Sequence, residues 1–504
     1  MGRVLPTFLA ALASAATLAI AGCGGGSSGS GGKDPLDNAL GYLPKTAPLV
    51  VAIDTDLNGS QWKSLGTIAN KFSFGGQITQ QLKQSINKQG LDFDKQIKPL
   101  LGNDAVIGAP DAQSIIGDAN SYVVALEVKD KDKLKSLLKR SKDLKADGSS
   151  HGANLYRQND GGETAQRDNV LLAADSKAQL EQALEQRDKS DRLTEDTFNS
   201  ALSDLSKDAL VRVYADLQAL IGGSTSASQA RQVKWVAALR TLGVAGSVTN
   251  SAISFDVNVK TDPQGLTDAD VPIATGDDSP GVAGERGELV FGLRGVNHVI
   301  DFAQSVAQTI SPGSFGDFAR AKAQIGAQLG IDVDKDVIDQ LSGDTSVALD
   351  LDGNYAIRSE VKDPAAFAKT LAKLARVAPS FAGGIGLQGA KLTKSRGLYK
   401  LSGSGDGKDV WFGVVNKVFV ISTQPARIAQ LASETPKPVN GAKGALVTSS
   451  DAGALVAKLI ARLGGGSFGS TLGGGIASAP LGNLDGWAST STSGLKAHLQ
   501  LGFK

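Results

Sequence analysis

The chain of 504 residues has very little cysteine and histidine: one Cys and three His. A single cysteine, Cys23, cannot form an intramolecular disulfide, so a disulfide framework is excluded. The histidines, His151, His298 and His498, stand far apart and show none of the spacings of a zinc site. The scarcity of both residue types therefore argues against a structural metal or disulfide core.

An excess of charge of one sign is also absent, with 52 Lys and Arg against 51 Asp and Glu. Arg3 is the one charged residue within residues 1–22, so the rest of the chain is balanced. Nucleic-acid binding usually requires a basic face, and this balance argues against such a partner. Because 41% of the residues are hydrophobic, the chain can bury a large core, and its length predicts two domains.

What the chain does contain is an apolar run that ends at its single cysteine. Residues 4–20 are rich in Ala and Leu and are interrupted by Pro6, which is typical of a secretory signal peptide rather than a spanning helix. The run from Ile20 to Cys23 (IAGC) resembles a bacterial lipobox. This resemblance implies removal of residues 1–22 and a diacylglyceryl group on the Cys23 sulfur. The alternative is ordinary cleavage that leaves a free thiol.

The segment 23–40 then combines the lipidation site, Cys23, with a Gly/Ser tether over residues 24–32. Nine such residues reach about 15 to 18 Å. Each buried methylene contributes about 0.8 kcal/mol, so two or three acyl chains hold a protein on a bilayer. We therefore expect a protein anchored by lipid at the extracytoplasmic face of the cell membrane, without a spanning helix.

The remainder of the chain repeats itself. GLDFDKQIKPLLGND from Gly90 aligns without gaps with GIDVDKDVIDQLSGD from Gly330. Five further pairs of segments keep one order in both halves, starting at Leu49 and Leu289, Glu127 and Glu360, Asn154 and Gly397, Asn169 and Lys417, and Ser251 and Ser493. This order predicts two homologous repeats, residues 41–260 and 288–504. They are joined by a Pro-, Gly- and Asp-rich linker over residues 261–287.

Within one half, hydrophobic periodicity predicts strands alternating with helices. Strands are expected at 49–53, 105–109, 121–128, 154–158, 169–174 and 251–259. Helices are expected around Ile78, Leu82 and Ile86, around 134–138, from Ser176, and over 61–72, the last burying Trp62, Leu65, Ile68, Ala69 and Phe72. The last strand alternates Ile253, Phe255, Val257 and Val259 as a half-exposed strand should. The pattern predicts an α+β fold in which each half is a mainly antiparallel sheet with helices packed on one face.

Three features resemble a known family: YLPKTAPLVVAIDTD at 42–56 with Trp62 shortly after it, the KPLLGND turn at Lys98, and the second copy of the unit. They are similar to actinobacterial envelope proteins grouped as domain of unknown function 3352. The resemblance spans nearly the whole mature chain. It implies an envelope location and a tandem architecture, and it carries no catalytic residues across.

Four aspartates recur in register in the two halves and are the strongest candidates for a duplicated site: Asp92, Asp94, Asp332 and Asp334. We interpret them as structural, because Asp94 and Asp334 each precede an apolar-periodic segment and can cap its helix. Asp130 and Asp363 have the same interpretation, the latter with Pro364 at the first helical position. A metal or acid–base site needs converging ligands, which the sequence does not show.

Two segments match the residue patterns of known ligand sites, a calcium loop and a dinucleotide fingerprint, without matching their structural context. In ALDLDGNYAIRSE, Ala348 and Ser359 occupy the first and twelfth positions of a calcium loop and cannot supply its carboxylates. A tight Asp-Gly hairpin at Gly353 is the better prediction. GIGLQG at 384–389 follows a predicted helix and precedes a strand, the reverse of a dinucleotide fingerprint, and we interpret it as a loop.

Two further motifs concern hydrolysis and lipid binding. G-x-S-x-G strings occur at 25–29 and 465–469, but neither has the strand-to-helix turn and histidine base of a serine hydrolase. Residues 129–145 predict a helix with Leu on one side and basic residues on the other, which can lie on anionic lipid. The matching helix at 362–378 keeps the apolar side and loses most of the charge, so we favour a solvated face.

These observations predict a lipoprotein that is not an enzyme, with no catalytic residue, no cofactor and no metal. We expect it to bind an apolar ligand or an envelope component between sheet and helices. A structural or protein-interaction module of the cell envelope is the alternative, and a hydrolase the third. The expected partners are the membrane, through the acyl anchor on Cys23, a lipid or other apolar ligand, and an envelope protein.

Overall fold

The computed structural model describes residues 35–73, 75–76, 84, 92–116, 121–141, 144–159, 161–224, 227–285, 287–463 and 479–504. Several predicted features lie outside the described residues: the signal peptide, Cys23, the glycine tether, the helix marked by Ile78, Leu82 and Ile86, and both G-x-S-x-G strings. The chain divides into two units: unit 1 is Met1–Ser228 with Leu239–Lys260, and unit 2 is Gln229–Ala238 with Thr261–Lys504.

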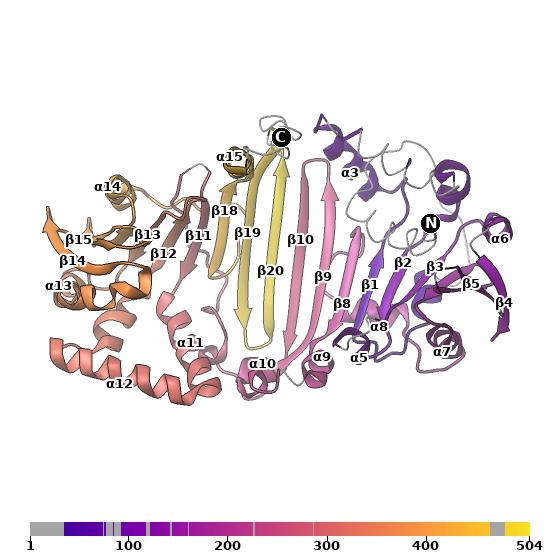
Figure 1. Cartoon of the computed structure of the whole chain (residues 1–504), viewed down its shortest axis with the longest axis horizontal. Helices are drawn as coiled ribbons and strands as arrows, with labels where there is room; N and C mark the ends of the chain where they lie inside the picture. Colours follow the sequence, from indigo (N-terminus) through magenta and orange to yellow (C-terminus); the bar gives the residue numbers. More distant parts are fainter. Residues whose placement is uncertain are drawn as a thin grey trace. The chain divides into compact units, whose positions relative to one another are not determined.

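The strands of unit 1 are mostly short, and two long strands close the unit (Figure 1). They are β1 (Leu49–Ile53), β2 (Ala105–Ala109), β3 (Val123–Glu127), β4 (Leu144–Ser150), β5 (Ala153–Gln158), β6 (Glu163–Arg167), β7 (Val170–Ala174), β8 (Val211–Asp216), β9 (Leu239–Thr249) and β10 (Ala252–Thr261). The helices are α2 (Pro35–Leu40), α3 (Ser60–Asn70), α5 (Gln113–Ile116), α6 (Lys131–Arg140), α7 (Lys177–Arg187), α8 (Glu195–Ala201) and α9 (Leu217–Gly223), with short η1 (Phe93–Ile97) and η2 (Lys98–Leu100).

The strand order in unit 1 is β4-β5-β6-β7-β3-β2-β1-β8-β9-β10. Every pair whose register is defined is antiparallel, as Val51 opposite Ile107 illustrates. One face of this sheet packs against α2, α7 and α8, where Leu40, Leu180 and Phe198 are fully buried. This packing forms the larger core of the unit.

Unit 2 also has ten strands among its described residues. They are β11 (Leu289–Arg294), β12 (Asp344–Leu349), β13 (Tyr355–Glu360), β14 (Gln388–Ser395), β15 (Leu398–Ser404), β16 (Val410–Val415), β17 (Val418–Ser422), β18 (Leu446–Asp451), β19 (Leu481–Ser491) and β20 (Gly494–Phe503). The helices are α10 (Lys234–Ala238), α11 (Val296–Ile310), α12 (Pro312–Leu329), α13 (Pro364–Phe381), α14 (Pro425–Ser433) and α15 (Ala452–Leu463). The short ones are η3 (Ala230–Gln232), η4 (Asp268–Asp270), η5 (Asp334–Ile338), η6 (Asp339–Leu341) and η7 (Ala382–Ile385).

The strand order in unit 2 is β14-β15-β16-β17-β13-β12-β11-β18-β19-β20. This is the order of unit 1 when β1 is matched with β11 and the other strands follow in sequence. The registers agree as well, since Val51 lies opposite Ile107 and Phe291 opposite Val347. The α+β class with an antiparallel sheet is therefore confirmed. Descent of the two units from one duplicated sequence stays a prediction.

The prediction that helices pack on one face only was wrong. Leu134, Leu137 and Leu138 of α6 pack with Leu126 of β3, whereas the neighbouring Ala125 belongs to the core under α7. Adjacent residues of a strand point to opposite faces, so helices cover both faces of the sheet. The periodicity of a helix reveals that it has a buried side, and it does not reveal which face of the sheet that side meets.

The local predictions agree closely with the structure. The strands expected at 49–53, 105–109, 121–128, 154–158, 169–174 and 251–259 are β1, β2, β3, β5, β7 and β10. The helices expected over 61–72, around 134–138 and from Ser176 are α3, α6 and α7. Phe72 differs, because α3 ends at Asn70 and Phe72 is only half-buried beyond it.

The segment expected to be a linker, residues 261–287, packs along unit 2 over much of its length. Val271 and Ala283 are buried, and Val282 forms a β-bridge with Lys437. Val282 and Ala283 belong to the same core as Val290 of β11. Its Pro, Gly and Asp residues therefore shape an ordered connection rather than a loose one.

Candidate functional site

The two long strands that end unit 2 carry an apolar row on one face. Leu495, Ala497, Leu499 and Leu501 alternate along β20, and all four are half-buried or exposed. Leu484 of β19 lies directly opposite Leu501 and therefore shares this face. Leu499 is 42% exposed, which is high for a leucine within a sheet.

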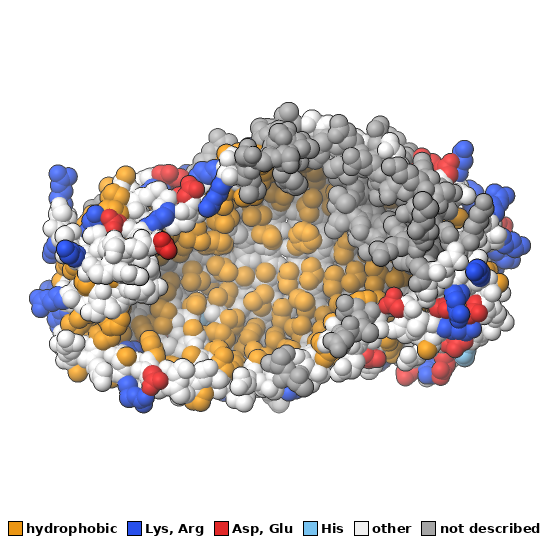
Figure 2. Space-filling view, viewed as in Figure 1, with side chains coloured by type: hydrophobic (Ala, Val, Ile, Leu, Met, Phe, Trp, Pro, Cys, Tyr) orange, Lys and Arg blue, Asp and Glu red, His pale blue; other side chains and the backbone are white. Residues whose placement is uncertain are grey.

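The same face continues over the neighbouring strands. Leu446 of β18 lies opposite Leu293 of β11, and Phe291 lies opposite Val347 of β12. Together with the row on β19 and β20, we call this surface the open apolar face; its other members are Leu289, Phe291, Leu293, Val347, Leu349 and Leu446, all half-buried or exposed. Figure 2 shows hydrophobic side chains gathered over β18, β19 and β20.

The opposite face of the sheet is closed over β11, β17 and β18. Val290, Val420 and Val447 are buried there and pack with Ile428 and Leu431 of α14. All five residues are less than 5% exposed. On β11 and β18 the exposure is therefore confined to the open apolar face, whereas on β20 the residues of both faces from Leu495 to Gly502 are half-buried or exposed.

Helix α13 covers the open side of the sheet at its other end. Phe367 packs edge-on against Phe419 of β17 with ring centroids 5.1 Å apart, and Leu371 and Ala375 pack with Tyr399 of β15. Asp363 caps this helix by accepting bonds from the N–H groups of residues 365 and 366. Helix α13 therefore covers this side over β15 and β17, whereas the open apolar face lies on β11, β12 and β18–β20.

The hydroxyl groups on the open apolar face are already used by the backbone. Thr448 Oγ1 donates to the carbonyl oxygen of Val290 at 2.8 Å, and Thr490 Oγ1 donates to that of Ile273 at 2.7 Å. An occupant of this face would therefore meet hydrocarbon and few polar partners. A surface of this kind suits an aliphatic chain rather than a ligand recognised by hydrogen bonds.

Unit 1 has a related surface on β8, β9 and β10. Val213 lies opposite Val244, and both are half-buried. Phe255 of β10 is 46% exposed and lies against Gly246, where a Cβ atom would come within 3.1 Å of the aromatic ring. The glycine therefore makes room for the ring on this side of the sheet.

The four recurring aspartates do not form a shared site. Asp92 Oδ1 accepts from the N–H of Lys95 at 3.0 Å, and Asp332 Oδ1 accepts from the N–H groups of Asp334 and Lys335. The interpretation as caps is right in kind, but Asp94 and Asp334 are not the capping residues. The reason is that the π-helical turns η1 and η5 already begin at residues 93 and 334, so the N–H groups that they leave free lie within reach of the preceding aspartates.

The other motifs largely agree with their structural interpretations. Asp130 accepts from the N–H of Lys133 and caps α6. Gly353 has φ +74° in the loop between β12 and β13, where Asp350 Oδ1 accepts from the N–H groups of Asp352 and Asn354. The sequence at 384–389 is a loop only in part, because residues 384–385 end η7 and residues 388–389 begin β14; the order of helix before strand is as expected.

Each histidine has its own, separate partner. His151 Nδ1 lies 3.3 Å from Asp188 Oδ2, and His298 Nε2 lies 2.9 Å from the carbonyl oxygen of Val271. His498 stacks on Trp487 with ring centroids 6.1 Å apart. Among the described residues, no group of three or more His, Cys, Asp or Glu side chains is arranged to hold a metal ion.

A charged cluster that the sequence analysis missed lies where β1 ends. Arg212 Nη2 lies 2.7 Å from Asp104 Oδ2, and Asp54 is close to both. Burial, opposed by the N–H of Asp56 and reinforced by the charge of Asp104, raises the pKa of Asp54 from 3.8 to about 6. The aligned position in unit 2 is Arg294, so the alignment of LVVAID with LVFGLR already contained this signal.

The chain belongs to the family described as "Protein of unknown function (DUF3352)", whose model matches residues 7–382. This membership confirms the resemblance to the domain of unknown function. No curated protein matches the chain.

Among solved structures, crystal forms I, III and IV of a protein named TP0453 are similar to parts of the chain, each at 9% identity. These matches cover 44–45% of this chain and 80–82% of that protein, with TM-scores of 0.26–0.28. Within the described residues, no helix is long and apolar enough to cross a membrane.

Proposed function

We propose that this protein is a lipid-anchored protein of the cell envelope that binds an aliphatic ligand on the open apolar face of unit 2. The observation that carries the proposal is the row of half-buried and exposed Leu, Val and Phe side chains, Leu499 and Leu349 among them, that continues on one face over β11, β12 and β18–β20. Burying such a surface gains about 25 cal/mol for each Å² of apolar area. The ligand class that fits is an acyl chain, because the hydroxyl groups of this face are already bonded to the backbone.

The proposed anchor makes this ligand available. A lipidated Cys23 on a short tether holds the protein body close to a bilayer, where acyl chains are the commonest apolar molecules. The proposed role is non-catalytic, and the hydroxyl groups of Thr448 and Thr490 on this face are bonded to backbone carbonyl oxygens. We place the protein at the extracytoplasmic face of the cell membrane, in agreement with the lipobox.

The test is photo-crosslinking in cells that are fed a diazirine-bearing palmitic acid. After irradiation the full chain is purified under denaturing conditions, and the crosslinked peptides are mapped by mass spectrometry. The peptide that contains Cys23 will carry acyl groups through the anchor, so it serves as the internal reference. We expect additional crosslinks in peptides from β11 and from β18–β20.

A matched pair of variants makes the result specific. Leu499→Gln with Leu501→Gln places polar groups on the open apolar face and should lower its crosslinking several-fold. Gln500→Ala changes the residue between them, which points to the opposite face, and should leave it unchanged. Crosslinks spread evenly over both faces, or restricted to the Cys23 peptide, would refute the proposal and favour a protein-interaction module of the envelope.

A further inference from the structure

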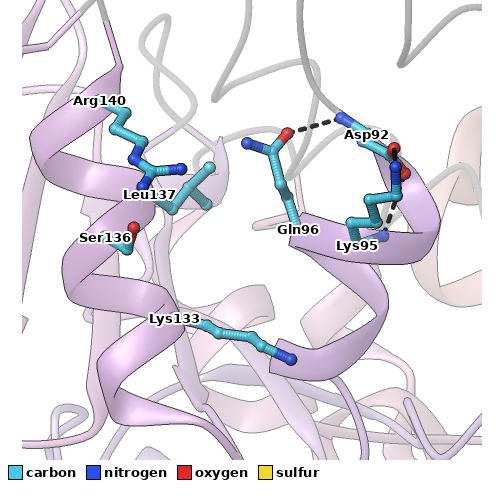
Figure 3. A pocket seen from close by; sticks show the side chains of 7 residues that line it. All are labelled: Asp92, Lys95, Gln96, Lys133, Ser136, Leu137 and Arg140. Carbon is cyan, nitrogen blue, oxygen red and sulfur yellow. Dashed lines mark hydrogen bonds and ion pairs between the residues drawn. The ribbon is translucent and has the colours of Figure 1, made fainter.

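Unit 1 contains a pocket that is separate from the apolar surfaces. It has a volume of about 420 Å³ and lies between η1 and α6. Its lining consists of Asp92, Lys95 and Gln96 from η1 and its cap, and Lys133, Ser136, Leu137 and Arg140 from α6. Figure 3 shows Gln96 and Lys133 reaching into the space between the two elements from opposite sides.

The charges around this pocket favour an anion. Three cationic side chains, Lys95, Lys133 and Arg140, line the pocket together with one carboxylate, Asp92, and a second carboxylate, Asp130, lies beside Lys133. The whole chain has a formal net charge of only +1, so this concentration is local. Basic residues gathered around a concave surface attract anionic ligands more strongly than the same charges spread over a flat one.

The existing ion pairs hold these cations only weakly. Lys95 Nζ lies 3.6 Å from Asp92 Oδ2, and Lys133 Nζ lies 3.7 Å from Asp130 Oδ2. Both lysine side chains are more than half exposed, and exposed pairs of this kind contribute at most about 1 kcal/mol. Both ammonium groups can therefore turn toward a ligand at little cost.

Neutral donors complete the lining. Gln96 Oε1 accepts from the N–H of Asp92 at 2.6 Å, which leaves the amide nitrogen of Gln96 to act as a donor. The Ser136 hydroxyl is half-buried on the opposite wall, and Leu137 is buried beside it. The pocket thus combines charged donors, neutral donors and one apolar contact.

The aligned surface of unit 2 differs. In the aligned helix α13, Ala366 replaces Lys133, Lys369 replaces Ser136 and Lys373 replaces Arg140. The Nζ atom of Lys373 donates to the carbonyl oxygen of Gly330 at 2.9 Å, so this cation already has a hydrogen-bond partner within the protein. We call the pocket between η1 and α6 of unit 1 the cationic pocket.

We propose that this pocket binds the phosphate group of an anionic phosphate ester, with a phospholipid headgroup as its source. Phosphate oxygens accept charge-assisted hydrogen bonds from ammonium and guanidinium groups, and the planar guanidinium of Arg140 suits two oxygens at once. The wall formed by Leu137 accommodates the carbon part of the ester. This proposal does not depend on an acyl chain at the open apolar face.

The experiment is a titration of the detergent-solubilised full chain at low salt, measured by isothermal titration calorimetry. Three probes are compared: inorganic phosphate, glycerol 3-phosphate and short-chain phosphatidylglycerol, with short-chain phosphatidylcholine as the reference lipid. Phosphatidylglycerol should bind more tightly than phosphatidylcholine. Tighter binding of phosphatidylglycerol than of glycerol 3-phosphate supports the lipid source, and equal binding overturns that source in favour of a soluble phosphate ester.

Two double variants with equal loss of charge locate the site. Lys133→Gln with Arg140→Gln removes two cations from the pocket and should weaken phosphatidylglycerol binding at least about tenfold. Lys131→Gln with Lys135→Gln removes two cations from the same helix outside the lining and should weaken it less than about twofold. Equal weakening by both pairs would mean diffuse attraction to a basic helix, and no binding of any phosphate probe at millimolar concentration would equally overturn the proposal.

Discussion

The charged carboxylate of Asp54 lowers the stability of the folded protein. Its side chain is half-buried near Asp104, and the neighbouring Arg212 is already paired with that second carboxylate. In unit 2 the aligned Arg294 binds Asp344 directly through two hydrogen bonds of 2.8 and 3.1 Å. Unit 1 therefore carries a costly negative charge where unit 2 carries a favourable ion pair.

We predict that Asp54→Asn stabilises the protein at neutral pH. The folded pKa of about 6 lies above the ordinary value of 3.8, so the folded state holds a proton between these values that the unfolded state has released. Stability therefore falls as pH rises from about 4 to 6, and the cost stays constant above that. Asparagine can still accept from the N–H of Asp56, and the gain at pH 7 should be about 2 kcal/mol.

Urea denaturation of the wild type and the variant at pH 4, 5, 6 and 7 checks this prediction. The difference between them should be small at pH 4 and should grow until about pH 6.5. Asp132→Asn reports the effect of losing one negative charge at an exposed position. A difference that does not change over this pH range would contradict a titrating, half-buried carboxyl group at Asp54.

At the scale of helices and strands, the sequence predicted which helices and strands exist better than it predicted the residues at which they begin and end. Short apolar runs located β1 and β2, and the apolar residues spaced three and four apart located α6. The π-helical turns at 93–97 and 334–338 were not predicted, since five-residue turns leave no periodicity to detect. This is why the capping role was assigned to Asp94 and Asp334 instead of Asp92 and Asp332.

The corrected assignment predicts unequal effects for two neighbouring aspartates. Asp332→Ala removes a side chain that accepts from two backbone N–H groups, and the expected loss of stability is about 1 kcal/mol. Asp334→Ala removes an ion pair with Lys322 whose acidic end is exposed, and the expected loss is below about 0.5 kcal/mol. Denaturant midpoints of the two variants give the comparison, and a larger loss for Asp334→Ala would contradict the cap at Asp332.

At the scale of the whole molecule, the sequence did not predict the order of the strands or which face of the sheet stays exposed. The alternation of Ile253, Phe255, Val257 and Val259 predicted one apolar side for β10 but not whether a helix covers it. Alternation records side-chain polarity along one strand, whereas coverage depends on where distant helices pack. The repeat alignment did pair strands that occupy equal places in the two strand orders, as β1 and β11 do.

The proposed location of the molecule rests on one atom, the sulfur of Cys23. We predict that Cys23→Ser abolishes lipidation and moves the protein from the membrane fraction to the soluble fraction, because one bilayer anchor is lost and no disulfide is affected. Cell fractionation with a carbonate wash, followed by immunoblotting, measures this. Ser27→Ala, four residues along the tether, is the matched control and should stay with the membrane.

If the Cys23→Ser protein still sedimented with membranes after the wash, the acyl anchor would not be what holds it there. Sedimentation in neutral buffer before the wash would indicate a second, weaker contact with the membrane. The open apolar face and the cationic pocket of unit 1 would then be the candidates for membrane contact, and their variants separate them. Leu499→Gln with Leu501→Gln would release a protein held by hydrocarbon contact. Lys133→Gln with Arg140→Gln would release one held by headgroups, and only this second kind of attachment would weaken as salt concentration rises.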